Sequence, residues 1–371
     1  MKTAQNLFNE RLGRLSTAVA LGKPDRVPIV AGVDAFAARH MGITAAEYIN
    51  DQDKASEILA QSVSNLGDVD ATLFITTFAR MAGPGWLSEV KLPGRDLGPN
   101  EPFQVHELGL MTLEDYDTII NKGWFYFFMD YVNTRLPKNA TADFHQYLST
   151  DFAKAAGNFI NKGIVPFSTV MSGPAYDILC AGRGMSNFTR DLFKMPDKVM
   201  AVMDVILEEN IQSYKQQITA AKPFAVWFGA TRSASEFMSP KAWQKFVWPY
   251  IKKAVEAIVD AGAYAYLHFD SNWDRDLEFF RELPKAKCIF GCDHATDIFK
   301  IKTALGDHMC IFGDVPAALL AIGTPDEVYN YCIKLINEIG PSGFILAAAC
   351  NIPANAKVEN VEAMVAAATG K

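Results

Sequence analysis

The sequence predicts an α/β fold, a TIM (β/α)8 barrel, and three observations lead to this prediction. Short apolar runs rich in strand-forming residues recur along the chain, and a longer amphipathic stretch follows each one, as in alternating strands and helices. There are eight such runs. No low-complexity segment, Gly/Ser-rich linker or short repeat divides the 371 residues. Since eight parallel strands with intervening helices form a TIM barrel, we expect one domain over residues 1–371.

The eight expected strands share an apolar composition and end at polar residues. They lie at residues 27–33, 71–76, 164–171, 224–229, 263–268, 287–291, 309–313 and 343–347. Helices are expected at the N-terminus, before the first strand.

The stretches between the runs contain ordinary helix start signals. Ser239-Pro240 places a capping hydroxyl before a proline at the first helical position. Thr324-Pro325 repeats the arrangement and is followed by two acids in the first turn. Both signals predict a helix and indicate nothing about catalysis.

Residues 83–140, after the second strand, lack strand spacing and contain Pro84-Gly85, Pro93-Gly94 and Pro99-Asn100. We expect an extended loop with helices, inserted as a lid that covers the barrel mouth. The aromatic run from Trp124 to Phe128 would shape an apolar cavity or pack within that lid.

Composition limits the classes of partner. A formal charge of −7 argues against nucleic acid or an anionic membrane as the main partner. The first residues resemble neither a secretory signal nor an anchor, and no apolar run reaches membrane-spanning length. Six cysteines in a chain this long give no disulfide framework, so reduced thiols in a cytoplasmic protein are expected.

The active site of a TIM barrel lies at the carboxyl ends of its strands, so polar residues that end an apolar run are the candidates. The fifth run ends in His268-Phe269-Asp270, and the eighth ends at Cys350. On a strand, positions i and i+2 share a face, which directs His268 and Asp270 the same way. Imidazole, carboxylate and thiolate together predict a zinc site or a proton-handling site.

Other strand-end residues are weaker candidates. Glu236 is either a site carboxylate or a solvated loop charge, and Cys292 competes with Asp270 as a third metal ligand. Asp34 is a candidate catalytic acid or base. The candidate substrate-binding residues are Tyr176, Trp227, Arg232 and Asn351.

Several motifs point to a known family. Lys23-Pro24-Asp25-Arg26-Val27-Pro28 precedes the first strand, Ser172-Gly173-Pro174 follows the third, and Gly313-Asp314-Val315 ends the seventh. With Ser239-Pro240, Trp248-Pro249-Tyr250 and the histidine of strand five, they resemble the uroporphyrinogen decarboxylase (URO-D) superfamily over nearly the whole chain. That TIM-barrel group includes true decarboxylases and corrinoid-dependent methyltransferases.

Departures from the decarboxylase pattern separate the two branches. The resemblance implies an Arg-Gln-Ala-Gly-Arg segment after strand one that holds porphyrinogen carboxylates, but residues 32–40 read GVDAFAARH. It also implies an essential aspartate just after strand two, whereas residues 72–88 contain no acid. Without that carboxylate a protonated pyrrole intermediate loses its main electrostatic support, so uroporphyrinogen decarboxylation is not expected.

The methyltransferase branch is similar to methylcobalamin:coenzyme M methyltransferases, in which His-x-Cys on strand five and a Cys on strand eight bind zinc. By this resemblance His268 and Cys350 are zinc ligands, and Asp270 replaces the first Cys as a third ligand or holds a ligand in place. Glu236 would be a fourth ligand or a proton donor to the leaving group. Fewer thiolates leave a stronger Lewis acid, which suits an ether or alcohol oxygen more than a thiol.

The sequence therefore predicts an enzyme of the kind used in anaerobic one-carbon metabolism. It would move a methyl group, with zinc, between a small methylated substrate and the cobalamin of a separate corrinoid protein. Two alternatives stay open: decarboxylation of a different acid, and a non-catalytic module that binds a corrinoid or tetrapyrrole.

Overall fold

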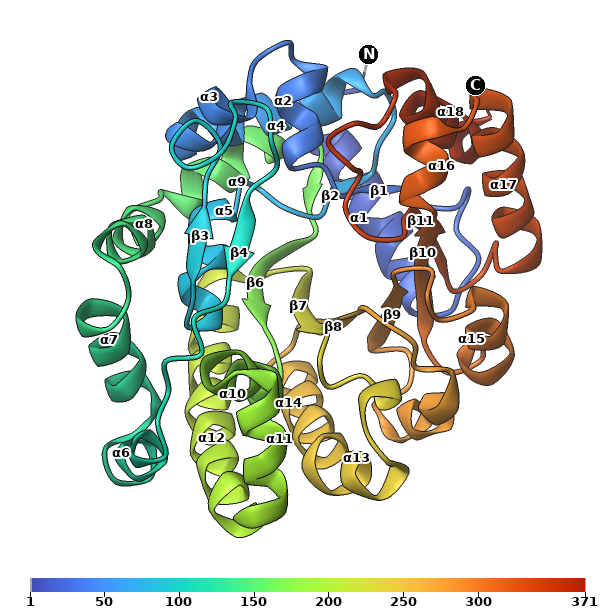
Figure 1. Cartoon of the computed structure of the whole chain (residues 1–371). Helices are drawn as coiled ribbons and strands as arrows, with labels where there is room; N and C mark the ends of the chain where they lie inside the picture. Colours follow the sequence, from blue (N-terminus) through green and yellow to red (C-terminus); the bar gives the residue numbers. More distant parts are fainter. Residues whose placement is uncertain (1, 371) are drawn as a thin grey trace.

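A computed structural model describes residues 2–370 as an α/β fold in which parallel strands are surrounded by helices (Figure 1). All eight expected strand segments contain strand, and the third is split into two. The parallel strands are β1 (Val30–Ala31), β2 (Ala71–Thr72), β5 (Val165–Pro166), β6 (Ser168–Ser172), β7 (Ala225–Ala230), β8 (Tyr264–Phe269), β9 (Cys288–Cys292), β10 (Cys310–Val315) and β11 (Phe344–Ala348).

These strands form two parallel sheets, ordered β1-β2-β5 and β11-β10-β9-β8-β7-β6. The segment 165–172 contributes to both, because β5 pairs with β2 while β6 pairs with β7. At the other edge, an isolated parallel bridge joins Ile29 to Leu346. The α/β fold with parallel sheets is thus as predicted.

Helices connect the strands and cover their outer faces. The α-helices are α1 (Ala4–Val19), α2 (Ala35–His40), α3 (Ala45–Asn50), α4 (Gln52–Asn65), α5 (Ala79–Ala82), α6 (Glu114–Lys122), α7 (Trp124–Thr134), α8 (Lys138–Leu148), α9 (Phe152–Ile160), α10 (Ala175–Arg183), α11 (Met185–Lys194), α12 (Pro196–Ala221), α13 (Pro240–Phe246), α14 (Trp248–Asp260), α15 (Ile298–Leu305), α16 (Ala317–Ile322), α17 (Pro325–Glu338) and α18 (Val358–Thr369). The 3-10 helices are η1 (Pro84–Trp86), η2 (Ser235–Phe237) and η3 (Asp274–Glu282).

The predicted helix starts are confirmed. The Ser239 side chain accepts a hydrogen bond from the backbone amide of Ala242 at the start of α13. Thr324 forms a reciprocal capping box with Glu327 at the start of α17.

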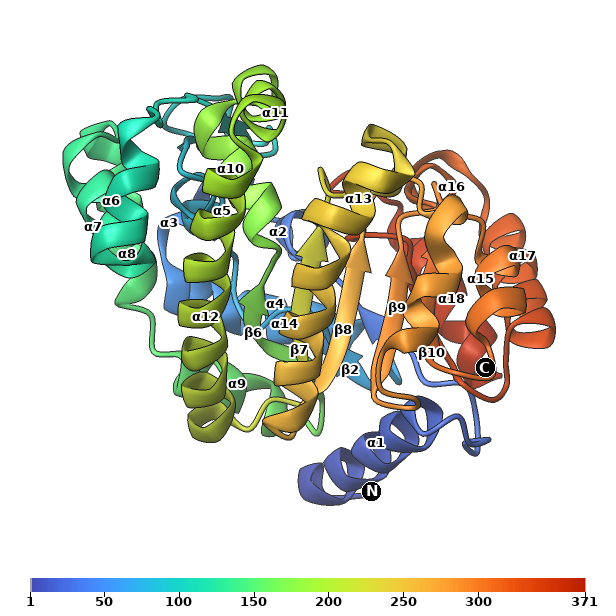
Figure 2. The ribbon, with the colours of Figure 1, turned by 90° about the horizontal axis from the view of Figure 1, so that it is seen from below.

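Side chains that alternate along the strands belong to two buried clusters, an inner core and an outer core. Tyr266, Ile289 and Phe312 belong to a buried inner cluster, to which Leu15 of α1 also contributes. Their neighbours in sequence pack outward against the helices. Figure 2 places α1 at the amino-terminal end of the strands, opposite α11 and α13. The carboxyl ends of the strands are therefore the end left for a site.

The segment 83–140 differs from the prediction in two respects. It contains an antiparallel pair, β3 (Glu89–Lys91) with β4 (Gln104–His106), where no strand was expected. Its helices α6 and α7 contact α12, so they lie at the flank beside that helix (Figure 2). A contact with the strand-end loops comes from the segment between β4 and α6, where Glu107 pairs with Arg232.

Strands β3 and β4 have three residues each, and all three residues of β4 are exposed. Such short strands carry too little apolar pattern to be recognised from sequence. In the described part of the chain, no helix is both long enough and apolar enough to cross a membrane.

Candidate metal centre

The histidine at the end of β8 is held by two aromatic side chains. The Tyr266 hydroxyl lies 3.0 Å from Nδ1 of His268, two residues along the same inner face. The Trp227 indole stacks on the imidazole, with ring centroids 5.3 Å apart. His268 is buried, and these contacts leave Nε2 for a ligand.

Glycines on both neighbouring strands make room for these rings. In the sheet register His268 lies between Gly229 of β7 and Gly291 of β9. A Cβ atom on Gly229 would come within 2.0 Å of the Trp227 ring, and one on Gly291 within 2.6 Å of the Tyr266 ring. Both positions therefore require glycine for close packing around the histidine.

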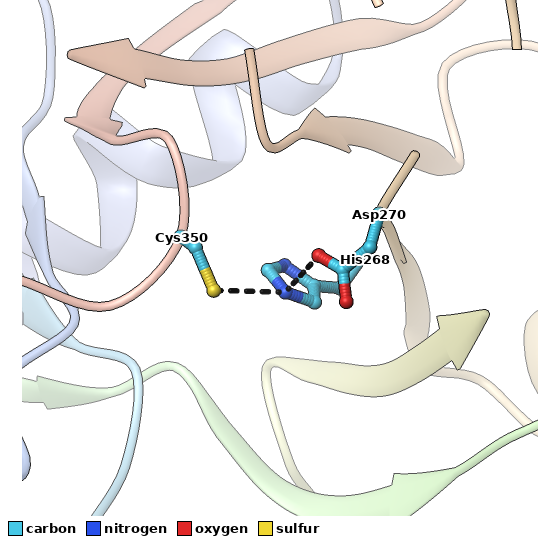
Figure 3. Close-up of side chains that lie close together, drawn as sticks. All are labelled: His268, Asp270 and Cys350. Atoms are coloured by element: carbon cyan, nitrogen blue, oxygen red, sulfur yellow. Dashed lines mark hydrogen bonds and ion pairs between the residues drawn. The ribbon is translucent and has the colours of Figure 1, made fainter. Parts of the chain in front are cut away.

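Three candidate ligand atoms converge at this point (Figure 3). Nε2 of His268 lies 3.3 Å from Oδ1 of Asp270 and 3.6 Å from Sγ of Cys350, and all three atoms lie within 4.8 Å of one another. Zinc bonds of about 2.0 Å to N and O and about 2.3 Å to S, at a tetrahedral angle, place N and O about 3.3 Å apart and N and S about 3.5 Å apart, close to these two distances. The donor types and these two distances are compatible with a zinc ion held by the three residues.

The electrostatics of the group favour a cation. Burial by itself lowers the pKa of His268, but Tyr266, Asp270 and Cys350 together outweigh burial and raise that pKa well above its ordinary value. Of the six cysteines, the other five are buried and Cys350 is exposed. A divalent ion that replaced the proton on His268 would meet the same favourable surroundings.

The two alternative ligands are not part of this group. Among the described residues, only His268, Asp270 and Cys350 form a set of metal-ligating side chains this close together. Cys292 is opposite Phe269 in the register and belongs to the outer core, so it faces the helices. Glu236 accepts the backbone amide of Asn272 at 3.0 Å. The structure therefore does not support Cys292 or Glu236 as ligands.

Asp34 is fully buried at the carboxyl end of β1 and precedes α2. Burial raises the pKa of its carboxyl group to about 6, and the hydroxyls of Thr77 and Tyr48 partly oppose this shift. Such a group can exchange a proton near neutral pH, as the predicted catalytic role requires.

The four predicted substrate-binding residues occupy different surroundings. Trp227 lies against His268, and its buried indole N–H has no hydrogen-bond partner in the described structure. Asn351 follows Cys350 directly, and the next residue, Ile352, donates its amide to Gly32 at 2.8 Å. Arg232 pairs through both terminal nitrogens with Glu107. Arg232 and Asn351 follow the ends of β7 and β11, whereas Trp227 lies within β7.

Tyr176 differs from the other three. It is 6% exposed and meets Phe188 edge to face at 4.9 Å, within the outer core between α10 and α11. Its role in substrate binding stays a prediction without a supporting contact in the described residues.

Sequence reasoning missed Tyr266 and the residues that hold the loop after His268. Tyr266 had a signal, because it lies two positions before His268 and shares its face. Asp293, which accepts a hydrogen bond from the Ser271 amide, directly follows the strand-end residue Cys292, whereas Thr296, which accepts one from the Trp273 amide, had no signal. Their contacts join loops whose separation only the fold determines.

Comparisons with known proteins agree with this architecture. The model of the family Uroporphyrinogen decarboxylase (URO-D) matches residues 162–370, more than half of the chain. No curated protein sequence matches. A solved structure of a methyltransferase from Methanosarcina mazei superposes with a TM-score of 0.71 at 16% identity, covering 100% of this chain and 99% of that one. At this identity the superposition shows a shared fold. By the family match, the chain belongs to the URO-D family.

Proposed function

We propose that this protein is a zinc-dependent methyltransferase that moves a methyl group between a small methylated substrate and the cobalamin of a separate corrinoid protein. The observation that carries the proposal is the spacing of the His268, Asp270 and Cys350 ligand atoms at strand ends. The fold shared with the Methanosarcina methyltransferase supports the same reading.

The ligand set favours an oxygen substrate. Zinc held by these residues would act as a Lewis acid toward the substrate atom that carries the methyl group. A ligand set with one thiolate donates less charge to the zinc than a set with two. The zinc is then a stronger Lewis acid, which suits an ether or alcohol oxygen. When the methyl group leaves that oxygen, the bonding electron pair stays behind and the oxygen takes up a proton.

The chain's own residues would orient the donor and supply that proton. Tyr266 and Trp227 fix the imidazole of His268 from two sides, so the ligand atom Nε2 cannot turn away. The free indole N–H of Trp227 would donate a hydrogen bond to the substrate. Asp34, whose carboxyl group has a pKa of about 6, and Glu236 are the candidate proton donors.

This function needs an open mouth at the carboxyl ends of the strands, and we propose that the two sheets form one closed barrel. The segment 165–172, which pairs with β2 and with β7, supports closure on one side. The bridge between Ile29 and Leu346, with the amide of Leu346 donating to Pro28 at 2.9 Å, supports it on the other.

Metal analysis and a spectroscopic assay test the proposal. We expect about one zinc per chain in protein purified without chelator, and below about one tenth in His268→Ala and Cys350→Ser. Free cob(I)alamin, used in place of the corrinoid protein, should convert to methylcobalamin with a methanol, methoxyaryl or methylamine donor, followed by absorbance. His145→Ala, at an exposed histidine on α8, is the matched control and should behave like the wild type.

Three outcomes would contradict the proposal. Wild-type protein that holds no zinc, and gains no activity when zinc is added, would remove the metal centre. Release of carbon dioxide from a porphyrinogen or another acid, without methyl transfer, would favour a decarboxylase. Cobalamin binding without turnover of any donor would favour a binding module.

A further inference from the structure

In the segment that follows His268 and contains Asp270, every backbone amide donates a hydrogen bond. The five consecutive N–H groups of residues 270–274 each have an acceptor at 2.9–3.0 Å, and four of these acceptors are side chains. The acceptors are, in order, Ala230 O, Asp293 Oδ2, Glu236 Oε1, Thr296 Oγ1 and Asn272 Oδ1. Residues 270–274 are half-buried or buried, and all five of their amides are bonded to acceptors within the protein.

Four hydrogen bonds to this segment come from residues 293–296, which we name the β9 loop. The Thr296 hydroxyl is buried and accepts the Trp273 amide at 3.0 Å while donating to the Ser271 carbonyl at 3.0 Å. Asp293 accepts the Ser271 amide at 2.9 Å, and the Asn272 side chain donates to the Ala295 carbonyl at 2.9 Å. Both backbone polar groups of Ser271, the residue directly after Asp270, are thus bonded to this loop.

The backbone at these contacts is strained. Ser271 has a φ of 71° and His294 a φ of 76°, in the left-handed region that side chains other than glycine rarely adopt. Such conformations are unfavourable and persist where surrounding contacts over-determine them. One strained residue adjoins the candidate ligand Asp270, and the other lies in the loop that holds it.

The β9 loop is itself anchored on its far side. Nδ1 of His294 lies 2.8 Å from one carboxylate oxygen of Asp314 in β10, and the Tyr331 hydroxyl of α17 donates to the other at 2.8 Å. A cavity of about 350 Å³ adjoins these three residues and includes none of the candidate ligands. The anchor therefore connects the β9 loop to the outer layer without entering the site.

We propose that Thr296 and Asp293 are positioning residues that hold Asp270 where a metal ion requires its carboxylate. The inference rests on the metal centre of the proposed function. The loop that contains Asp270 is bonded on one side to Ala230 of β7 and Glu236 of η2. On the other side it is bonded to the β9 loop. Glu236, predicted as a ligand, belongs on this interpretation to the same support.

Thr296→Val tests the inference, because valine keeps the shape of threonine and removes the hydroxyl. Hydrogen exchange of residues 268–274, measured in metal-free protein, should quicken about 10-fold or more, as expected for the loss of a buried hydrogen bond. Zinc affinity, measured by competition with a chromophoric chelator, should fall about 10–100-fold. Cobalt(II) absorption should report an altered ligand field.

Matched variants control the experiment. Thr296→Ser restores the hydroxyl and should recover both exchange and affinity. Thr303→Val makes the same change at an exposed threonine of α15 whose hydroxyl donates only to Phe299 within the helix, and it should change neither. Asp293→Ala, at a partly exposed position, should give the same loss as Thr296→Val even if the buried valine impairs folding.

The possible failures are distinguishable. Unchanged exchange in Thr296→Val and Asp293→Ala would overturn the support by the β9 loop, whether or not the protein binds zinc. Faster exchange with unchanged zinc affinity would reduce the loop to a structural role and overturn the positioning of Asp270. Wild-type protein without zinc would instead overturn the metal centre and with it the proposed function.

Discussion

Two buried aspartates at opposite ends of the strands behave differently. Asp70 precedes β2 at the amino-terminal end, where it pairs with Arg14 and with Arg26 and accepts the Ile29 amide at 2.8 Å. Asp34 follows β1 at the carboxyl end, where Tyr48 and Thr77 offer only hydroxyls. Among the described residues, no lysine or arginine pairs with Asp34. One carboxylate is neutralised, and the other is left able to carry a proton.

The difference shows how the fold divides its two ends. A buried carboxylate between two guanidinium groups ties α1 to the strands and has no capacity left for chemistry. At the carboxyl end, ligand atoms of His268, Asp270 and Cys350 lie within 4.8 Å of one another and the pKa of His268 is raised, which favours binding of a cation. The amino end is built for stability and the carboxyl end for reactivity, the same division that TIM barrels show.

The largest expected effect is at Asp70. Asp70→Asn breaks a buried network and leaves Arg14 and Arg26 short of a partner, so the free energy of unfolding should fall by about 3–5 kcal/mol. Urea unfolding measures this loss. Asp25→Asn, at an aspartate with 65% side-chain exposure that pairs with the same Arg14, should cost at most about 1 kcal/mol. Equal losses in the two variants would remove the distinction between buried and exposed partners of Arg14.

The next effect is the pH dependence that Asp34 introduces. Burial raises its pKa from 3.8 to about 6, so the folded state binds the proton more tightly than the unfolded state. The contribution of Asp34 is fully present below about pH 4 and is lost as pH rises past 6, a difference of about 3 kcal/mol. Asp34→Asn, which cannot ionise, should gain stability relative to wild type across that interval. A stability difference that stays constant from pH 4 to pH 8 would contradict this account of the carboxyl end.

The smallest effect is expected at the ion pair between Arg232 and Glu107. Both side chains are partly exposed, at 25% and 39%, so solvent screens their attraction. Glu107→Gln should change the free energy of unfolding by less than about 1 kcal/mol. Urea unfolding at low and high salt checks the value. A loss as large as that of Asp70→Asn would mean that the carboxyl end also depends on ion pairs for its stability.

Much of the site follows from strand periodicity. The alternation of faces directs His268 and Asp270 together, and the rule that active sites lie at strand ends predicts their meeting with Cys350, 82 residues away. The same alternation places Cys292 outside, since its register partner Phe269 faces the helices. Cys292 was an alternative ligand because it ends a strand, and the end of a strand by itself does not fix the face.

Other features had no local signal. Glu236 has the chemistry of a ligand, and only the packing of η2 beside the segment after β8 directs its carboxylate to an amide. Helices α6 and α7 were expected over the mouth, but the path of the chain after β4 brings them against α12. Both outcomes depend on contacts between segments far apart in sequence.

The sequence by itself determined the alternation of strands and helices, the motifs of the URO-D family and the three residues of the candidate centre. Periodicity and residue chemistry are local properties, so they can be read from one chain. Only the tertiary structure decided the spacing of the ligand atoms, the support of Asp270 by the β9 loop and the different surroundings of Asp70 and Asp34. These depend on distances between non-adjacent segments, which packing and burial set once the chain is folded.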